Sequence, residues 1–394
     1  METQTCVSEQ ADAKAARAAI ARAWRGEPLG SADAVALISC PEQELSRLLK
    51  AASRLRDRGK GRLLTYSPKV FLPVTNLCRD RCTYCTFRKE PDDPEAWTMT
   101  REEIADWSRR GRELGCREAL VCLGDKPERA YPRYRQTLAE LGVASTIAYV
   151  REACAIALEA GLLPHTNAGL MSRAELELLR PVNASMGLML ENISPRLRGR
   201  GQPHQWAPDK TPALRVQTIE WAGQLSVPFT TGILVGIGET LAERAESLLA
   251  IRDLHARHGH IQEVIIQNFR AKSEIAMAQA LEPQPLEMAR AIATARLLLG
   301  PAMNIQAPPN LSPDHLELFL AAGVNDWGGI SPLTSDFVNP EAPWPHLAEL
   351  RARCARAGFE LRPRLPVYPE YIDPAWIDPG LTDRVRRAAA ELRS

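Results

Sequence analysis

Eight short apolar runs alternate with longer amphipathic stretches between residues 70 and 330. Strands that alternate with helices in this way form a parallel sheet, and eight such units close into a barrel. We therefore predict an α/β fold, a TIM-like (βα) barrel with about eight strand–helix units. An open six-stranded barrel with appended helices is the alternative. The runs are VFLPVT (70–75), ALVCLG (119–124), LLPHTNAG (162–169), ASMGLMLE (184–191), FTTGILVG (229–236), EVIIQNF (263–269), NIQAP (304–308) and DWGGI (326–330).

The segments on either side of these runs have a different composition. Residues 10–60 carry apolar positions at helical spacing, and Pro41 stands where the first turn of a helix tolerates proline. The proline-rich segment RPRLPVYPEYIDPAWIDPG predicts an extended tail that wraps the barrel. We divide the chain into an N-terminal helical extension (1–65), the barrel (66–372) and a C-terminal tail with a short helix (373–394).

Charge and hydropathy exclude several classes of partner. The chain has 49 Lys and Arg against 48 Asp and Glu, which argues against a nucleic-acid interface or a polybasic membrane surface. No run is apolar for long enough to span a bilayer. The first residues, METQTCVSEQADAK, lack the basic and apolar regions of a signal peptide. We expect a cytoplasmic protein with no membrane or nucleic-acid partner.

Three of the nine cysteines crowd into VTNLCRDRCTYCTF, directly after the first run. Cys78, Cys82 and Cys85 form a C-x3-C-x2-C pattern, and thiolates suit iron–sulfur clusters or zinc. A zinc knuckle needs a fourth ligand, and no further Cys or His lies nearby. The charged residues between the cysteines oppose a simple core position. We therefore predict a 4Fe–4S cluster held by these three cysteines, with one iron left open.

The cysteine pattern resembles that of the radical S-adenosylmethionine (SAM) superfamily. In that superfamily SAM chelates the open iron, and its reductive cleavage gives a 5′-deoxyadenosyl radical. The resemblance implies that the ring of Tyr84 packs near the adenine. It also implies that LGDKPE, with Gly124 and Asp125, meets the SAM amino group. Asp125 stands where the superfamily prefers Glu, which shortens the reach by one methylene.

Two later runs end in residues that the same resemblance assigns to SAM. Glu191 would accept ribose hydroxyls, and Arg196 would pair with the SAM carboxylate. GILVGIGET resembles G-x-I-x-G-x-x-E, with Leu234 at the position of the Ile. The resemblance implies that Gly236 lets the backbone approach adenine, that Ile237 covers its face and that Glu239 closes the motif. The alternatives are an ordinary strand–helix turn and an exposed salt bridge.

Further segments make the resemblance more specific. The chain resembles the first subunit (CofG) of the synthase of 7,8-didemethyl-8-hydroxy-5-deazariboflavin (FO), the precursor of coenzyme F-420. The segments that carry this resemblance are VTNLCRDRCTYCTFRK, LGDKPE, GLLPHTNAG, GLMLENIS, TTGILVGIGET, QNFRAK, GVNDWGGISPLT and VNPEAPWP.

The resemblance implies a lyase reaction shared between two proteins. A second radical SAM subunit, of the CofH type, joins a tyrosine-derived hydroxybenzyl group to 5-amino-6-(D-ribitylamino)uracil. The first subunit then abstracts a hydrogen from this adduct, closes the deazaflavin ring and releases ammonia. A single C-x3-C-x2-C motif here implies that the partner is another polypeptide. A flavodoxin or ferredoxin is expected as the reductant.

Polar residues at the ends of other runs are candidates for substrate contact. His165 and Asn167 end the third run, and His165 would act in proton transfer during ring closure. Gln267 would reach the adenine edge or the substrate. Asn310 and Asp326 would bind the uracil or ribityl group. The alternative for each is a polar residue that stabilises a cap or turn.

Three other functions stay open at this point. A menaquinone-pathway enzyme shares the barrel and the SAM motifs. A biotin-synthase-like sulfur inserter needs an additional cluster, for which no second group of cysteines is present. A non-catalytic iron–sulfur protein has no use for SAM motifs or for a barrel of this size.

Overall fold

The structure, a computed structural model, describes the fold of residues 2–392 and the side chains of residues 10–392. Eight parallel strands form a ring in chain order, and β1 pairs with both β8 and β2, which closes the barrel. The predicted eight-stranded barrel is therefore confirmed, and the open six-stranded alternative is wrong. The strands are β1 (Leu63–Pro73), β2 (Glu118–Cys122), β3 (Leu163–Asn167), β4 (Ser185–Gly187), β5 (Phe229–Val235), β6 (Ile261–Asn268), β7 (Asn304–Gln306) and β8 (Asp326–Ile330).

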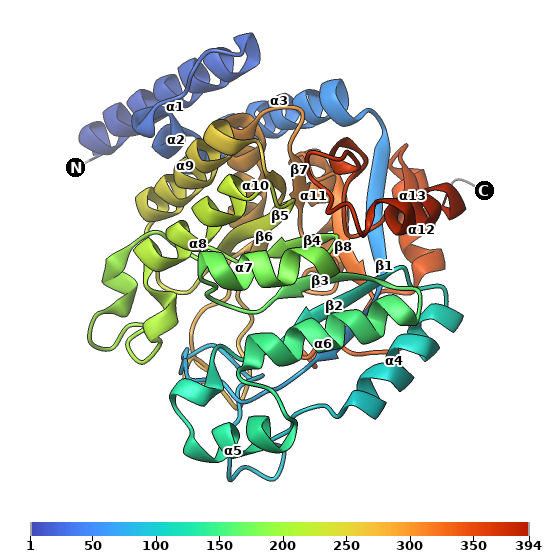
Figure 1. Cartoon of the computed structure of the whole chain (residues 1–394). Coiled ribbons are helices and arrows are strands. Elements are labelled where there is room, and N and C mark those ends of the chain that lie inside the picture. The colour runs from blue at the N-terminus through green and yellow to red at the C-terminus, as the bar shows by residue number, and fades with distance from the viewer. Residues whose placement is uncertain (1, 393–394) are drawn as a thin grey trace.

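Helices surround the ring and bury the outer faces of the strands (Figure 1). Capping boxes begin α4, α7 and α9, in which a Ser or Thr and a Glu three residues later satisfy free backbone N–H groups. The helices are α4 (Arg101–Glu113), α5 (Pro132–Glu140), α6 (Thr146–Glu159), α7 (Arg173–Leu179), α8 (Pro212–Gln224), α9 (Leu241–His258), α10 (Pro285–Leu299), α11 (Leu316–Ala321) and α12 (Leu347–Arg356).

Short 3₁₀ turns interrupt the loops between these elements. Each has proline at its first or second position, where the missing N–H costs no hydrogen bond. The turns are η1 (Pro127–Arg129), η2 (Arg180–Val182), η3 (Pro195–Arg198), η4 (Pro208–Lys210), η5 (Pro313–His315) and η6 (Pro369–Tyr371).

Three helices precede the barrel, as the sequence predicts. They are α1 (Glu2–Arg25), α2 (Ser31–Ile38) and α3 (Glu42–Lys60). The pairs α2–α9 and α3–α10 are in contact, and Leu45, Leu48 and Leu55 of α3 are buried at helical spacing. The three helices therefore extend the hydrophobic core of the barrel, on the upper left in Figure 1. The domain boundaries stay a prediction.

The proline-rich tail differs from its prediction as a wrapping segment. It first forms a ninth strand, β9 (Glu360–Pro363), which pairs in parallel with the start of β1. Residues 364–368 are then buried, and they bond to residues near the beginnings of β4, β6 and β8. The tail therefore closes the N-terminal end of the barrel from inside. It ends in η6 and α13 (Thr382–Glu391).

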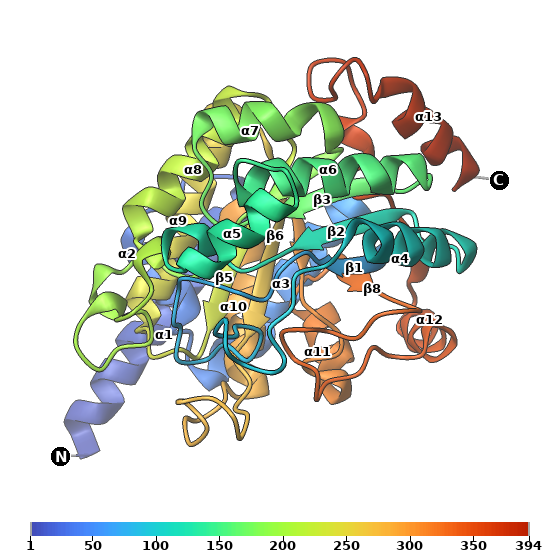
Figure 2. The same ribbon diagram turned by 60° about the horizontal axis from the view of Figure 1, so that its bottom comes forward.

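The opposite end of the barrel carries the long loops. The loops that follow β1 and β6 gather at the lower end in Figure 1, and Figure 2 brings this end toward the viewer. In (βα) barrels the chemistry sits at this C-terminal end of the strands.

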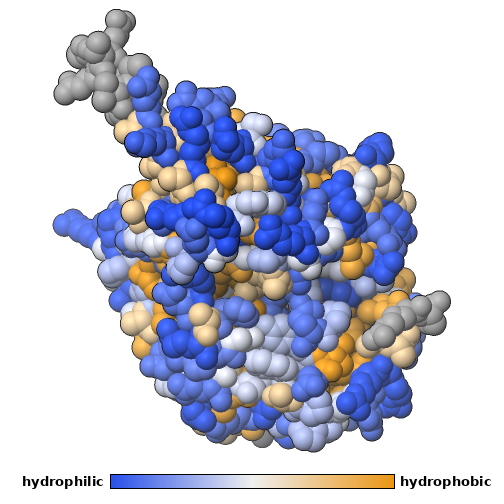
Figure 3. All heavy atoms as spheres, turned by 90° about the horizontal axis from the view of Figure 1, so that it is seen from above, coloured by the Kyte–Doolittle hydropathy of each residue, from blue (hydrophilic) through white to orange (hydrophobic). Residues whose placement is uncertain are grey.

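The outer surface gives no sign of a membrane-spanning element. Among the described residues, no helix combines the length and the hydropathy that crossing a bilayer requires. The face in Figure 3 is mostly hydrophilic, with apolar side chains in scattered groups.

Candidate active site

A cavity of roughly 380 Å³ runs along the barrel axis. All eight strands contribute lining residues, from the cysteine loop at the C-terminal end to Arg364 and Pro366 of the tail at the N-terminal end. The cavity therefore has two ends of different chemistry, which are described in turn.

The three predicted cysteines lie together at the open end. Cys78, Cys82 and Cys85 are free, half-buried and line the cavity. The backbone N–H of Asp125 donates to Cys78 Sγ at 3.1 Å, but burial outweighs this bond and raises the pKa of the Cys78 thiol well above its ordinary value. Burial raises the pKa of the Cys82 thiol to about 12, so a bound cation is needed to hold it as a thiolate. Three cysteines that line one cavity supply the number of thiolate ligands that a 4Fe–4S cluster with one open iron needs.

The turn after β2 supports the cysteine loop and presents a carboxylate. A Cβ on Gly124 would lie 2.0 Å from the carbonyl oxygen of Leu77, so only glycine allows this close approach. Asp125 is buried, and its Oδ2 accepts the N–H of Leu170 at 2.9 Å. Its Oδ1 is buried and has no hydrogen-bond partner among the residues that the structure describes. A buried carboxylate oxygen in this state can accept a hydrogen bond from the ammonium group of a ligand.

Two more carboxylates surround this position. Oxygen atoms of Asp80, Asp125 and Asp209 lie within 4.8 Å of one another, and all three residues are buried. Burial raises the pKa of Asp125 to about 7, and the charge of Asp209 adds to the effect. Arg79 compensates part of this charge through two hydrogen bonds to Asp209. The open end is therefore suited to a cationic group, such as the amino group of SAM.

Glu191 lies beyond β4 in a left-handed backbone conformation (φ 63°) and lines the cavity. Its Oε1 is 2.6 Å from Lys210 Nζ. Burial alone would raise the pKa of Glu191, but Lys210 and Arg215 outweigh burial and hold the pKa below its ordinary value. The sequence reasoning missed Lys210 and Arg215, which both line the cavity.

Arg196 was expected beside Glu191 but lies outside the cavity. It is exposed and forms an ion pair with Glu243 at 2.7 Å, and it donates to the carbonyl of Gly238. Its place near Glu191 in the sequence does not bring it into the lining, because η3 directs it to α9.

The glycine motif after β5 also differs from its expected role. Glu239 is buried, and its carboxylate accepts the N–H groups of Gly236 and Ile237, both at 2.9 Å, and pairs with Arg244. None of the three motif residues is among the residues that line the cavity. Ile237 packs with Leu234, which does line it. This motif shapes the turn that supports the cavity wall.

Other predicted residues line the cavity. Tyr84 does so, and its hydroxyl lies 2.9 Å from His204 Nε2. His165, Asn167 and Gln267 also line it, as strand alternation predicts for the two residues of β3. Burial lowers the pKa of His165 to about 4, against the opposing charge of Glu118. The roles of these residues stay predictions.

Asn310 and Asp326 have partners within the protein. Asn310 donates to Asp336 and to the carbonyl of Ala342. Asp326 is fully buried, lies outside the cavity lining and is bonded to Arg364 through both carboxylate oxygens.

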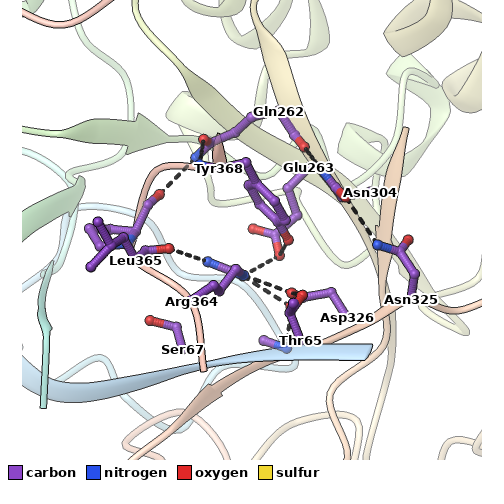
Figure 4. A network of polar contacts seen from close by, with 12 residues as sticks. Thr65, Ser67, Gln262, Glu263, Asn304, Asn325, Asp326, Arg364, Leu365 and Tyr368 are labelled. Atoms are coloured by element: carbon purple, nitrogen blue, oxygen red, sulfur yellow. Dashed lines mark hydrogen bonds and ion pairs between the residues drawn. The ribbon is translucent and has the colours of Figure 1, made fainter. Parts of the chain in front are cut away.

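The closed, N-terminal end of the cavity is lined by buried charged groups, which we call the floor (Figure 4). Lys69 and Glu118, neighbours in β1 and β2, form an ion pair at 2.8 Å. Arg364 reaches from the tail to Asp326 at 2.6 Å and to Glu263 at 2.7 Å. Lys69, Glu118, Glu263 and Arg364 line the cavity. Buried charged groups that line a cavity can accept or donate hydrogen bonds to a polar ligand, so this end is suited to one.

Comparison with known proteins connects these features. Residues 72–251 match the model of the radical SAM superfamily. The FO synthase of Mycobacterium tuberculosis is 49% identical over 398 residues, which cover 96% of this chain and 46% of the relative. The chain thus spans about half the length of such relatives. The 7,8-didemethyl-8-hydroxy-5-deazariboflavin synthase of Methanopyrus kandleri is 46% identical and is covered over 97% of its length, against 82% of this chain.

Solved structures share the fold at low sequence identity. Methylornithine synthase superposes with a TM-score of 0.66 at 21% identity, over 88% of this chain and 97% of that chain. The FeFe-hydrogenase maturase HydG from Carboxydothermus hydrogenoformans gives a TM-score of 0.73 at 17% identity, over 100% of this chain and 90% of that chain. These likenesses support the barrel and not a shared substrate.

Proposed function

Because the chain belongs to the radical SAM superfamily and, within it, to the 7,8-didemethyl-8-hydroxy-5-deazariboflavin (FO) synthase family, we propose that it performs the ring-closing step of FO formation. In this proposal it is a radical SAM lyase that acts on the hydroxybenzyl–ribityldiaminouracil adduct and releases ammonia. The product is the precursor of coenzyme F-420. The relatives favour this function over the menaquinone-pathway, sulfur-insertion and non-catalytic alternatives.

One observation carries the proposal. A single cavity joins three clustered cysteines and an unpartnered buried carboxylate oxygen to a polar floor. A 4Fe–4S cluster and SAM, when bound, supply a 5′-deoxyadenosyl radical that removes a hydrogen atom from a substrate. The radical needs a substrate held next to it and water excluded from it. The barrel meets both needs, because the tail closes the end opposite the cysteines.

The residues at the open end of the cavity have the following roles in this proposal. Cys78, Cys82 and Cys85 hold three irons and leave one for SAM. Asp125 Oδ1 receives the SAM amino group through a charge-assisted hydrogen bond. Lys210 replaces Arg196 as the cation beside Glu191, where a SAM carboxylate and the ribose hydroxyls would find partners.

The polar residues deeper in the barrel hold the adduct. Asn167 and Gln267 offer amide groups that suit the uracil edge. Lys69, Glu118 and Glu263 offer charged partners to the ribityl hydroxyls. The second radical SAM subunit supplies the adduct, and a flavodoxin or ferredoxin supplies the electron.

The experiment is an anaerobic reconstitution. The second subunit first makes the adduct from tyrosine and the diaminouracil, and the adduct is purified away from that subunit and from its 5′-deoxyadenosine. The protein is loaded with iron and sulfide, reduced, and mixed with SAM and the purified adduct. We expect blue–green FO fluorescence together with 5′-deoxyadenosine, and loss of both in Cys82→Ala. Deoxyadenosine without FO would contradict the proposed substrate. Neither product, from protein with a full cluster, would contradict the radical chemistry.

A further inference from the structure

The inference concerns the ring of His165 and the residue that holds it. His165 on β3 and Ser185 on β4 face each other as paired residues of the sheet. His165 Nδ1 lies 2.7 Å from Ser185 Oγ, and both residues are buried. A hydroxyl can donate to a ring nitrogen or accept from it, so this contact alone does not identify the tautomer.

A third group, the carbonyl of Pro366, removes this ambiguity. Ser185 Oγ also lies 2.7 Å from the carbonyl oxygen of Pro366 in the tail. A carbonyl only accepts, and a serine hydroxyl has one proton, so this proton lies between Ser185 and Pro366. His165 Nδ1 must therefore carry the proton that it shares with Ser185. The opposite tautomer would leave two buried oxygens in contact at 2.7 Å with no hydrogen between them.

The carbonyl of Pro366 is itself fixed in position. Gln262 Nε2 donates to it at 3.0 Å, while Gln262 Oε1 accepts the N–H of Tyr368 at 3.2 Å. Figure 4 shows the end of the Gln262 side chain next to Tyr368 of the tail. The tail thus aligns the carbonyl for Ser185.

The other ring nitrogen is left accessible. A Cβ on Gly187 would lie 3.0 Å from His165 Nε2, so any other residue at this position would cover that nitrogen. Gly187 and His165 both line the cavity. The charged groups that face the ring are Glu118 from β2, Lys69 from β1 and Arg364 from the tail. Burial keeps the pKa of His165 well below neutral, so the ring is neutral and Nε2 has a free lone pair.

We propose that Ser185, backed by the Pro366 carbonyl, is a positioning residue that fixes His165 as the Nδ1–H tautomer, so that Nε2 accepts a hydrogen bond from a substrate N–H or O–H. This inference rests on the proposed function, whose adduct carries ring N–H groups and ribityl hydroxyls. It makes His165 an acceptor toward substrate and excludes it as the donor of a proton in its resting state.

The tautomer can be observed without turnover. Nitrogen–proton correlation spectra of the ¹⁵N-histidine-labelled holoenzyme distinguish Nδ1–H from Nε2–H rings, and His165→Gln identifies the signal. We expect Nδ1–H in the wild type from pH 6 to pH 8, and a mixture in Ser185→Ala. The matched control is Ser108→Ala, because Ser108 is equally buried but its hydroxyl has no partner. A wild-type ring protonated on Nε2 would overturn the inference.

Binding of the product FO, followed by its fluorescence, tests the role toward ligand. We expect Ser185→Ala to weaken binding about threefold to tenfold, which corresponds to one net hydrogen bond. Ser185→Cys, which retains a weak donor and acceptor, should recover part of the loss. His165→Gln, with an amide group near the Nε2 position, should bind more tightly than His165→Phe.

The pH dependence separates the two possible roles of His165. Affinity of the wild type for FO should be flat between pH 8 and pH 6, and an affinity that rises on acidification would overturn the inference. Failure of the wild type to bind FO would instead contradict the proposed function. An Nε2–H ring in a protein that binds FO would contradict this inference alone.

Discussion

Replacing Arg364 with methionine tests how the tail holds the barrel closed. Arg364 Nε and Nη2 bond to Asp326 at 2.6 and 3.0 Å, and Nη2 also bonds to Glu263 at 2.7 Å. The side chains of all three residues are at most 6% exposed. Methionine keeps most of the apolar volume and removes the guanidinium. Arg364→Met therefore leaves two buried carboxylates without their cation.

The expected cost follows from this burial. Removing one partner of a buried ion pair destabilises a protein by about 3–5 kcal/mol, because the remaining charge is left uncompensated. The 394 residues of the chain give an unfolding entropy of roughly 0.8 kcal/mol/K, at about 2.1 cal/mol/K per residue. The unfolding midpoint should therefore fall by about 4–6 °C at pH 8.

The loss should depend on pH with a defined sign. Burial raises the pKa of Glu263 to about 7, against the lowering effect of Arg364. Between the ordinary pKa of about 4.3 and this value the folded state binds more protons than the unfolded state, so stability falls as pH rises. Arg364 holds the pKa of Asp326 below its ordinary value, so without Arg364 the pKa of Asp326 rises and that of Glu263 rises further. The carboxyls can then take up protons at pH 5.5, and the loss of stability should be smaller there than at pH 8.

Thermal unfolding at these two pH values provides the assay. The control is Arg362→Met, because Arg362 lies two residues earlier, on β9, and forms an exposed ion pair with Glu360, which contributes little. Adding Asp326→Asn to Arg364→Met should recover part of the loss by neutralising one carboxylate. Equal midpoints for Arg364→Met and Arg362→Met at both pH values would refute the reasoning.

Three further predictions, with four substitutions, address the open end of the cavity and the residues around it. Lys210→Met should weaken SAM binding about tenfold, because it removes a cation from the cavity lining, whereas Arg196→Met should leave SAM binding unchanged. Equal SAM affinities of the two variants in equilibrium dialysis would contradict the assignment of Lys210 to SAM. Gly124→Ala places a Cβ 2.0 Å from the Leu77 carbonyl, so iron content per chain after reconstitution should drop, and full loading would show that the loop adapts. Glu239→Gln should lower the free energy of unfolding by about 3 kcal/mol in denaturant unfolding and leave the SAM affinity unchanged. A weaker SAM affinity with unchanged stability would show instead that Glu239 contacts SAM.

The periodicity of the sequence was enough to predict the barrel. Each of the eight apolar runs contains or overlaps one strand, because strands buried on both faces need continuous apolar residues. The path of the tail was not predictable in the same way. Prolines indicate extended chain, but they do not indicate which surface that chain lies against. Only the structure shows that residues 364–368 are buried inside the barrel.

The floor had a sequence signal that was not used. Charged residues stand at or near the beginnings of four apolar runs: Lys69, Glu118, Glu263 and Asp326. A charge at such a position in a closed barrel faces the interior or its end, where it needs a partner. The partner Arg364 lies 38 residues beyond Asp326 and 101 beyond Glu263, so local spacing could not identify it.

The same limit explains why the position of Arg196 could not be predicted. Arg196 is close to Glu191 in the sequence, but a 3₁₀ turn directs it toward Glu243 at the surface. Lys210, 19 residues after Glu191, returns through a second 3₁₀ turn to within 2.6 Å of the carboxylate. Proximity in the sequence predicts contact only within regular elements, where the spacing of side chains is fixed.

The two ends of the cavity should be separable by substitution, because different parts of the chain build them. The cysteine loop and Asp125 depend on backbone contacts between the segments after β1 and β2. The floor and the acceptor state of His165 depend on Arg364 and Pro366, which come from the tail. Arg364→Met should thus weaken FO binding in protein that still takes up a full complement of iron, and Gly124→Ala should do the opposite. Loss of iron and of FO binding together in both variants would show instead that the cavity forms as one cooperative unit.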